Sequence, residues 1–286
     1  MQAERIDDPA TFLDRAGPLL LEDEARNNLI LGVAGTLRDH PRAYAEHRLW
    51  VALDEGAVVG AALRTPPFNL ILGCPATTAA LPALAETIHS TDTELPGVTA
   101  ALPEADAFAV EWEARTGSAR RARMAQRIYR AEEIRPPAGM RGRHRIATEG
   151  DRTLLVAWLR AFAEEALHGL DAPAGNSERA VDTRLAGAGG FVLWEADGEI
   201  VSLAGWGGRT PNGVRIGPVY TPPEYRRSGY GTAVTAAVSQ DLLASGRRFC
   251  FLYTDLSNPT SNSIYAAIGY EPVCDSVEYA FDFKGG

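Results

Sequence analysis

Apolar residues recur along this chain with the two spacings that mark amphipathic helices and β-strands. Across residues 151–165, apolar side chains return every three or four positions, which predicts a helix with one buried face. Two apolar runs, 191–195 and 199–206, flank the dipeptide Asp197-Gly198, which is typical of the tight turn in a β-hairpin. The second half of the chain is therefore expected to combine helices with antiparallel strands.

The rest of the second half continues this pattern. The further elements expected there are a strand at 144–147, a helix at 178–185, a strand at 214–220, a helix ending near 244, a strand at 249–253, a helix at 261–268 and a strand at 277–283. Together with the helix and the hairpin above, the predicted order in this half is β-α-α-β-β-β-α-β-α-β.

The first half shows a similar order. Residues 51–60 resemble residues 193–202, because both place an acidic turn with glycine between two apolar runs. The further elements expected in this half are helices at 10–21, 25–38, 78–89 and 105–116 and strands at 68–72 and 123–129. We interpret the two halves as a pseudo-repeat, although a single hairpin match leaves coincidence open. A proline- and glycine-rich segment, 135–142, predicts a boundary between a domain at 1–135 and a domain at 136–286.

The most informative segment begins where the strand at 214–220 runs into Pro222 and Pro223. It reads Arg226-Arg227-Ser228-Gly229-Tyr230-Gly231-Thr232 and opens a predicted helix. The first amides of a helix have no partner inside it and carry the positive end of its dipole, so they attract anions. Glycine lets a diphosphate approach such amides without a Cβ in the way.

Two nucleotide-binding motifs are excluded by residue identity. The motif G-x-G-x-x-G requires glycine where Val234 stands. The P-loop requires lysine directly after its last glycine, and the only lysine of this chain is Lys284. A purely structural interpretation, in which Gly229 and Gly231 only allow a tight turn from strand to helix, stays open.

A second motif follows at a suitable distance along the chain. It reads Asn258-Pro259-Thr260-Ser261-Asn262-Ser263-Ile264-Tyr265-Ala266-Ala267-Ile268-Gly269-Tyr270. Together with the R-x-x-G-x-G of residues 226–231, this segment resembles the GNAT superfamily of N-acetyltransferases, whose pattern is N-x-x-[AS]-x-x-[LI]-Y-x-x-x-G-[FY]. The resemblance is specific over residues 214–275.

The resemblance implies an α/β (α+β) fold of two tandem GNAT-like domains, each a mixed, mostly antiparallel sheet flanked by helices. The motifs are intact in the second half. The corresponding loop of the first half, 73–78, lacks the R-x-x-G-x-G pattern, and its Pro75 has no amide hydrogen to offer an anion. We therefore expect a degenerate first copy and a catalytic second copy.

The resemblance also implies acetyl-CoA as the co-substrate. Backbone groups of the strand would pair with the pantetheine arm, amides of the glycine loop would hold the pyrophosphate, and polar groups of the second motif would contact the arm. The expected contacts are Val219, Thr221, Arg226, Arg227, Ser228, Gly229, Tyr230, Gly231, Thr232, Asn258, Ser261 and Asn262. Asn258 stands at a helix entry, so a capping role is the open alternative for it.

Tyr265 occupies the tyrosine position of the family and is expected to be the general acid that protonates the thiolate of CoA. A packed aromatic is the alternative. The strand at 214–220 contains no carboxylate that would act as general base. Glu164 and Glu165 are the candidates for a base acting through water, or for recognition of the amine's charge, and a solvated helix end is the alternative. His168 follows at an exposed helix exit and receives no role.

Composition narrows the class of protein and its partners. The chain has 286 residues and a net charge of −9, which fits two soluble domains and disfavours nucleic-acid binding. No apolar run approaches the roughly 20 residues of a membrane span, and the first residues lack the pattern of a signal peptide. The cysteines at 74, 250 and 274 form no metal-type pair, so we expect neither a metal nor a disulfide, and a cytoplasmic location.

The sequence thus predicts an acyl-CoA-dependent N-acetyltransferase that transfers an acetyl group to a primary amine of a small molecule or peptide. The alternative is a non-catalytic acyl-CoA sensor or interaction module, which would keep the loop at 226–231 but not require Tyr265. The acceptor, the acyl-chain preference and the oligomeric state have no readable signal.

Overall fold

The computed structural model of this chain describes residues 1–166 and 175–282, apart from the side chains of residues 166 and 259–262. The chain forms two compact units that are not consecutive in sequence. The first unit contains residues 1–129, residues 253–259 and the C-terminal segment from Pro272. The second unit contains residues 130–252 and 260–271, so the chain passes between the units after residues 129, 252, 259 and 271.

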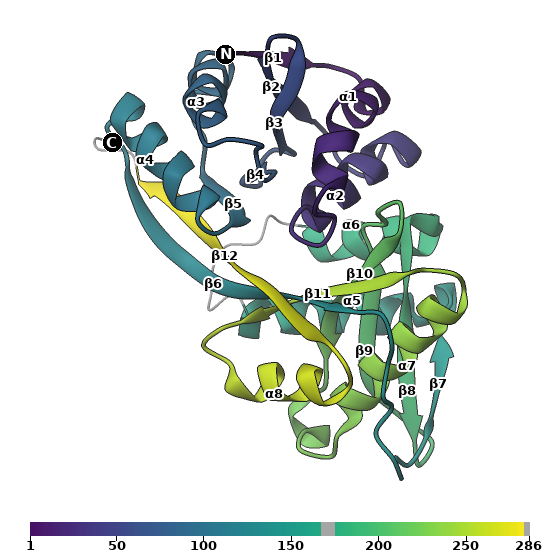
Figure 1. Cartoon of the computed structure of the whole chain (residues 1–286). Coiled ribbons are helices and arrows are strands. Elements are labelled where there is room, and N and C mark those ends of the chain that lie inside the picture. The colour runs from purple at the N-terminus through teal and green to yellow at the C-terminus, as the bar shows by residue number, and fades with distance from the viewer. Residues whose placement is uncertain (167–174, 283–286) are drawn as a thin grey trace. The chain divides into compact units, whose positions relative to one another are not determined.

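The first unit is a mixed sheet with helices packed on it (Figure 1). Its strands are β1 (Gln2–Ile6), β2 (Arg48–Asp54), β3 (Ala57–Arg64), β4 (Leu70–Leu72), β5 (Gly97–Ala101), β6 (Ala119–Ala131) and β12 (Glu271–Asp282), and its helices are α1 (Pro9–Leu21), α2 (Asn28–Asp39), α3 (Ala80–Thr91) and α4 (Glu104–Thr116). The strand order is β1-β2-β3-β4-β5-β12-β6. The pair β4–β5 is parallel, whereas β1–β2, β2–β3, β3–β4 and β5–β12 are antiparallel.

The second unit has the same plan. Its strands are β7 (Arg143–Ile146), β8 (Gly189–Ala196), β9 (Glu199–Gly207), β10 (Gly213–Tyr220) and β11 (Phe249–Asp255), and its helices are α5 (Arg152–Ala166), α6 (Asn176–Thr183), α7 (Tyr230–Ala244) and α8 (Pro259–Ala267). The strand order is β11-β10-β9-β8-β7, and the pair β10–β11 is parallel while the others are antiparallel. The predicted fold class, a tandem α/β (α+β) arrangement with mixed, mostly antiparallel strand pairing flanked by helices, is confirmed.

Local sequence signals explain where several of these elements begin and end. The carboxylate of Asp8 accepts the amide of Thr11 at 2.7 Å and so caps the start of α1. Pro9 then takes the first helical position, where the missing amide hydrogen removes no bond. Helix α4 ends at Gly117, whose φ of +69° lies in the left-handed region that favours glycine.

Two strands of the first unit have no predicted counterpart. β1 contains charged residues, and only Ile6 of this strand is buried, so its pattern is a weak strand signal. β5 is a short strand, Gly97–Ala101, in which the β-branched residues Val98 and Thr99 stand among glycine and alanine, which are less typical of strands. Both strands are defined by pairing with a neighbour more than by their own composition.

The strand expected at 277–283 to close the second half belongs to the first unit instead. β12 pairs with β5 in antiparallel register, with Ser276 beside Ala101 and Ala280 beside Gly97. Phe281 of this strand lies in the core of the first unit, where its ring centroid is 5.9 Å from that of Trp112 in α4. The apolar pattern predicts the strand correctly, but the prediction of its sheet is wrong, because the pattern contains no information about the partner.

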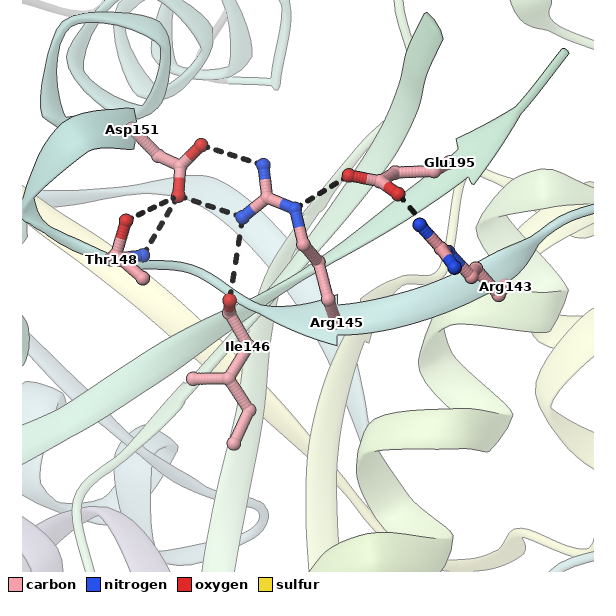
Figure 2. A network of polar contacts seen from close by, with 6 residues as sticks. All are labelled: Arg143, Arg145, Ile146, Thr148, Asp151 and Glu195. Atoms are coloured by element: carbon pink, nitrogen blue, oxygen red, sulfur yellow. Dashed lines mark hydrogen bonds and ion pairs between the residues drawn. The ribbon is translucent and has the colours of Figure 1, made fainter. Parts of the chain in front are cut away.

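A network of charged groups joins β7, β8 and the start of α5 within the second unit (Figure 2). The two terminal nitrogens of Arg145 each donate to Asp151 at 2.8 Å, and its Nε donates to Glu195 at 2.6 Å. Asp151 also accepts the amide of Thr148 at 2.8 Å, which caps the turn before α5. These bonds, chiefly the one from Arg145, lower the pKa of Asp151 to about 2.

Replacement of Phe281 should reveal that the last strand stabilises the first unit. Phe281→Ala removes a buried aromatic ring and should lower the free energy of unfolding by about 3 to 5 kcal/mol. Urea unfolding would measure the loss, and hydrogen exchange should show reduced protection in β5. The control is Val110→Ala on the exposed side of α4, which should change stability by less than about 0.5 kcal/mol. Reduced protection confined to peptides of the second unit would contradict the assignment of β12.

The network around Arg145 predicts an acid-sensitive contribution to stability. The folded state holds the pKa of Asp151 at about 2, below its ordinary value of 3.8, so the carboxylate stabilises the fold above pH 4. This contribution, about 2 kcal/mol, should be lost as the pH falls from 4 to 2. Asp151→Asn should therefore be less stable than wild type at pH 7 and equal to it near pH 2 in thermal unfolding. Glu199→Gln, on an exposed position of β9, is the control that should follow the wild-type curve.

Candidate functional site

The strands β10 and β11 pair over only part of their length. The parallel pairing joins residues 213–215 with residues 249–251. Beyond this point β10 continues to Tyr220 and stays paired with β9, with Val219 beside Ala204, after a register irregularity between Ile216 and Val219. The distal part of β10 is therefore the place in this sheet where an extended ligand arm would lie as an added strand.

The loop after β10 leads directly into α7. A single helical turn at Pro223–Tyr225 is followed by Arg227 and Gly229, whose φ values of +64° and +80° lie in the left-handed region. The first helical hydrogen bond runs from the amide of Ala233 to the carbonyl of Gly229 at 3.0 Å. Within the described part of the chain, the amides of residues 227–232 have no hydrogen-bond acceptor. This leaves a row of donors at the positive end of a 15-residue helix.

Gly231 lies where a side chain would close the space between this row of amides and β10. A Cβ built at Gly231 would be 3.3 Å from Oγ1 of Thr221, which is tighter than ordinary van der Waals contact. Oγ1 of Thr221 is itself fixed by a 2.8 Å hydrogen bond with Oγ of Ser202, and that hydroxyl donates to the carbonyl of Tyr220 at 3.1 Å. Ser202 has no predicted role, and its only sequence signal is a small polar residue inside an apolar strand.

The equivalent loop of the first unit uses its amides differently. The amide of Gly73 donates to the carbonyl of Ala61 at 2.9 Å, and that of Cys74 donates to Oδ1 of Asn27 at 2.8 Å. Further along, the amides of Ala76, Ala79, Ala80 and Leu81 donate to Val59, Thr77, Thr77 and Thr78. Pro75 has no amide hydrogen. The amides of Gly73, Cys74 and Ala76 in this loop are therefore engaged within the fold, in contrast to those of residues 227–232.

Arg226 lies against α5 as well as on the loop. Its Nε donates to the carbonyl of Thr221 at 2.9 Å, and its Nη2 donates to Oε2 of Glu165 at 2.5 Å. The other carboxylate oxygen of Glu165 accepts the hydroxyl of Tyr220 at 3.2 Å. Both predicted glutamates are exposed, and the structure brings Glu165 into contact with Tyr220 at the end of β10.

Tyr220 is held rigidly at this position. Its ring lies in the core of the second unit, 5.9 Å from the ring centroid of Trp158 in α5, and the guanidinium of Arg226 is 5.9 Å from its ring centroid. Burial raises the pKa of Tyr220, and the negative charge of Glu165 raises it further. The phenol is therefore neutral at physiological pH and donates its hydrogen to Glu165.

Tyr265 lies in α8 with its side chain partly buried. Its ring centroid is 6.1 Å from that of Tyr270 in an edge-to-face arrangement, and burial raises the pKa of Tyr265 to about 12. Oη of Tyr270 shares a 2.7 Å hydrogen bond with Oγ of Ser239 in α7, which ties the end of the second motif to the helix of the first. Gly269, directly before Tyr270, has a φ of +105°, and a Cβ there would be 2.6 Å from the carbonyl oxygen of Glu133.

For the other predicted site residues, the structure gives exposure and position but no contact that indicates a role. Arg227, Ser228 and Gly229 are exposed, and Tyr230 and Thr232 are partly buried in the first turn of α7. Asn258 is exposed and belongs to the segment that groups with the first unit. The side chains of Ser261 and Asn262, and all of His168, lie outside the described residues. The contacts of Ser261 and Asn262 with the cofactor therefore stay predictions.

The described residues contain neither a metal site nor a membrane-spanning helix. There, no cluster of histidine, cysteine and carboxylate side chains has the arrangement of a metal site. No described helix is both long and apolar enough to cross a bilayer.

Part of the second half of the chain matches a known protein family. Residues 194–279 match the family described as FR47-like protein. No curated protein matches the chain at a significant level.

Solved structures with the same fold cover nearly the whole chain. A GCN5-related N-acetyltransferase from Kribbella flavida has 18% identity and a TM-score of 0.61, over 92% of this chain and 96% of its own. A tandem GNAT protein from the clavulanic acid biosynthesis pathway has 17% identity and a TM-score of 0.62, over 100% and 99%. A GCN5-related N-acetyltransferase from Sphaerobacter thermophilus has 16% identity and a TM-score of 0.61, over 99% and 96%. The resemblance to the GNAT superfamily is thereby confirmed: the chain has the fold of tandem GNAT proteins, with the FR47-like family pattern in its second half.

Proposed function

We propose that this protein is an acyl-CoA-dependent N-acetyltransferase that transfers the acetyl group of acetyl-CoA to a primary amine by direct attack. The observation that carries the proposal is the row of amides at residues 227–232, which have no acceptor in the described chain and border the distal part of β10. A diphosphate and an extended arm joined to it match this combination of a helix N-terminus and a partly unpaired strand.

In this proposal the two units have different tasks. The second unit binds acetyl-CoA and the amine, and the first unit is a degenerate copy without a diphosphate site. The hydrogen bonds that engage the amides of Gly73 and Cys74 support this division. The reaction would take place in the cytoplasm, without nucleic acid as a partner.

The chemistry needs an acid for the leaving thiolate and a group that removes a proton from the amine. We assign the acid role to Tyr265, because it stands at the tyrosine position of the second motif and its neutral phenol carries a proton that it can donate to the leaving thiolate. Glu165 is the carboxylate closest to the end of β10 and is assigned to the amine side.

A non-catalytic acyl-CoA sensor is the second candidate. The observation that favours it is the absence of a carboxylate from β10, combined with the pairing of Glu165 with Arg226. A sensor would bind CoA equally well but would not depend on Tyr265.

Gly231→Val tests the site itself. The valine side chain would enter the space beside Thr221 and should weaken binding of CoA at least tenfold, because the diphosphate loses its approach to the amides. Isothermal titration calorimetry with CoA would measure the change. Gly17→Ala in α1, where an added Cβ meets nothing within 4 Å, is the matched control and should leave the affinity unchanged. Equal affinities for the valine variant and wild type would show that CoA does not bind here.

Tyr265→Phe separates an enzyme from a sensor. We expect acetyl transfer, followed as release of the CoA thiol, to fall by about 100-fold or more, because the thiolate loses its proton donor. The affinity for CoA should stay within a factor of two in calorimetry. Tyr44→Phe in the first unit is the control and should keep wild-type activity. Full activity in the Tyr265 variant would remove this residue from the mechanism.

A further inference from the structure

The hydroxyl of Tyr220 and the carboxylate of Glu165 form a hydrogen-bonded pair with a fixed direction. The hydroxyl donates to Oε1 of Glu165 at 3.2 Å, and no donor among the described residues is bonded to its lone pairs, which can accept another proton. The pair lies at the carboxyl end of β10, directly beside Thr221. It therefore borders the distal part of β10, along which the arm of acetyl-CoA would extend from the glycine loop in the proposed function.

The surroundings hold this pair in one geometry. The ring of Tyr220 is fixed by the core, with Trp158 on one side. Oε2 of Glu165 is held by Nη2 of Arg226, and Nε of the same guanidinium is anchored on the carbonyl of Thr221. Charged groups near the hydroxyl of Tyr220 are Glu165, Arg226 and Glu224. Arg226 is thus a positioning residue that aligns the carboxylate with the phenol.

We propose that Tyr220 and Glu165 act together as the proton-accepting relay of the reaction, which supplies the general base that β10 itself lacks. The amine nitrogen attacks the thioester carbonyl carbon and forms the new C–N bond. One hydrogen of that nitrogen moves to Oη of Tyr220 while the phenolic hydrogen moves to Oε1 of Glu165. Collapse of the tetrahedral intermediate breaks the C–S bond, and the thiolate takes its proton from Tyr265. This inference rests on the proposed function.

In the proposed relay, proton transfer from the amine requires both Tyr220 and Glu165. The phenol of Tyr220 is neutral, so it accepts a proton only if it releases its own at the same moment. Glu165 is the acceptor in contact with it. The side chain of Glu165 is 45% exposed, so the carboxyl group returns its proton to water after each cycle. A buried carboxylate would not exchange with solvent so directly.

The test compares Tyr220→Phe, Glu165→Gln and the double variant. A panel of butylamine, spermidine and a tripeptide with a free N-terminus first identifies the amine that the wild-type protein acetylates fastest. Each single variant should lower kcat for this amine by about 100-fold, while affinity for acetyl-CoA and the melting temperature stay close to wild type. The double variant should be no slower than the slower single variant, because a broken relay cannot be broken twice. Added formate should restore part of the activity of Glu165→Ala.

Several outcomes would overturn the relay. Wild-type kcat in Tyr220→Phe, a double variant whose losses multiply, or no rescue of Glu165→Ala by formate would each do so. Glu164→Gln is the control for the neighbouring carboxylate and should keep the wild-type kcat. A fall in kcat equal to that of Glu165→Gln would show that the hydrogen bond between Glu165 and Tyr220 is not what matters. Failure of the wild-type protein to acetylate any amine of the panel, despite binding acetyl-CoA, would contradict the proposed function itself and the relay with it.

Discussion

The candidate site depends on one constraint, which is that a helix begins where a strand ends without using its first amides. Helix α7 starts at Tyr230, directly after Gly229 in the left-handed region, and its first internal bond begins only at Ala233. The donors before that residue face no acceptor in the described chain, so an anion would complete their hydrogen bonds at little structural cost. The first unit, with the same element order, satisfies the amides at the start of α3 by internal bonds to Thr77 and Thr78.

The two polar clusters of the second unit lie at opposite ends of α5. At its start, Arg145 and Asp151 fix the helix to β7, and at its end, Glu165 contacts Tyr220 and Arg226. A helix held at its start is a stiff support for a carboxylate at its end. The geometry proposed for proton transfer therefore depends on bonds at the opposite end of a 15-residue helix from the reacting groups.

Features that depend on neighbouring residues were predictable from the sequence, and features that depend on distant ones were not. The turn at Asp197-Gly198, the helix after Gly229 and most element positions follow from local composition and periodicity. The contact between Glu165 and Arg226 joins residues 61 positions apart, and no periodicity indicates it. The choice between Glu164 and Glu165 likewise depends on which side of α5 meets β10, which adjacent residues in a sequence cannot distinguish.

The placement of β12 has a consequence for biosynthesis. β5 of the first unit receives its antiparallel neighbour only from residues 276–280, at the far end of the chain. During translation at about 5 to 20 residues per second, the ribosome needs roughly 8 to 30 s to pass from residue 129 to the end of this strand. For that interval the nascent N-terminal unit carries an open sheet edge, a row of unpaired backbone groups that can pair with another chain until synthesis is complete.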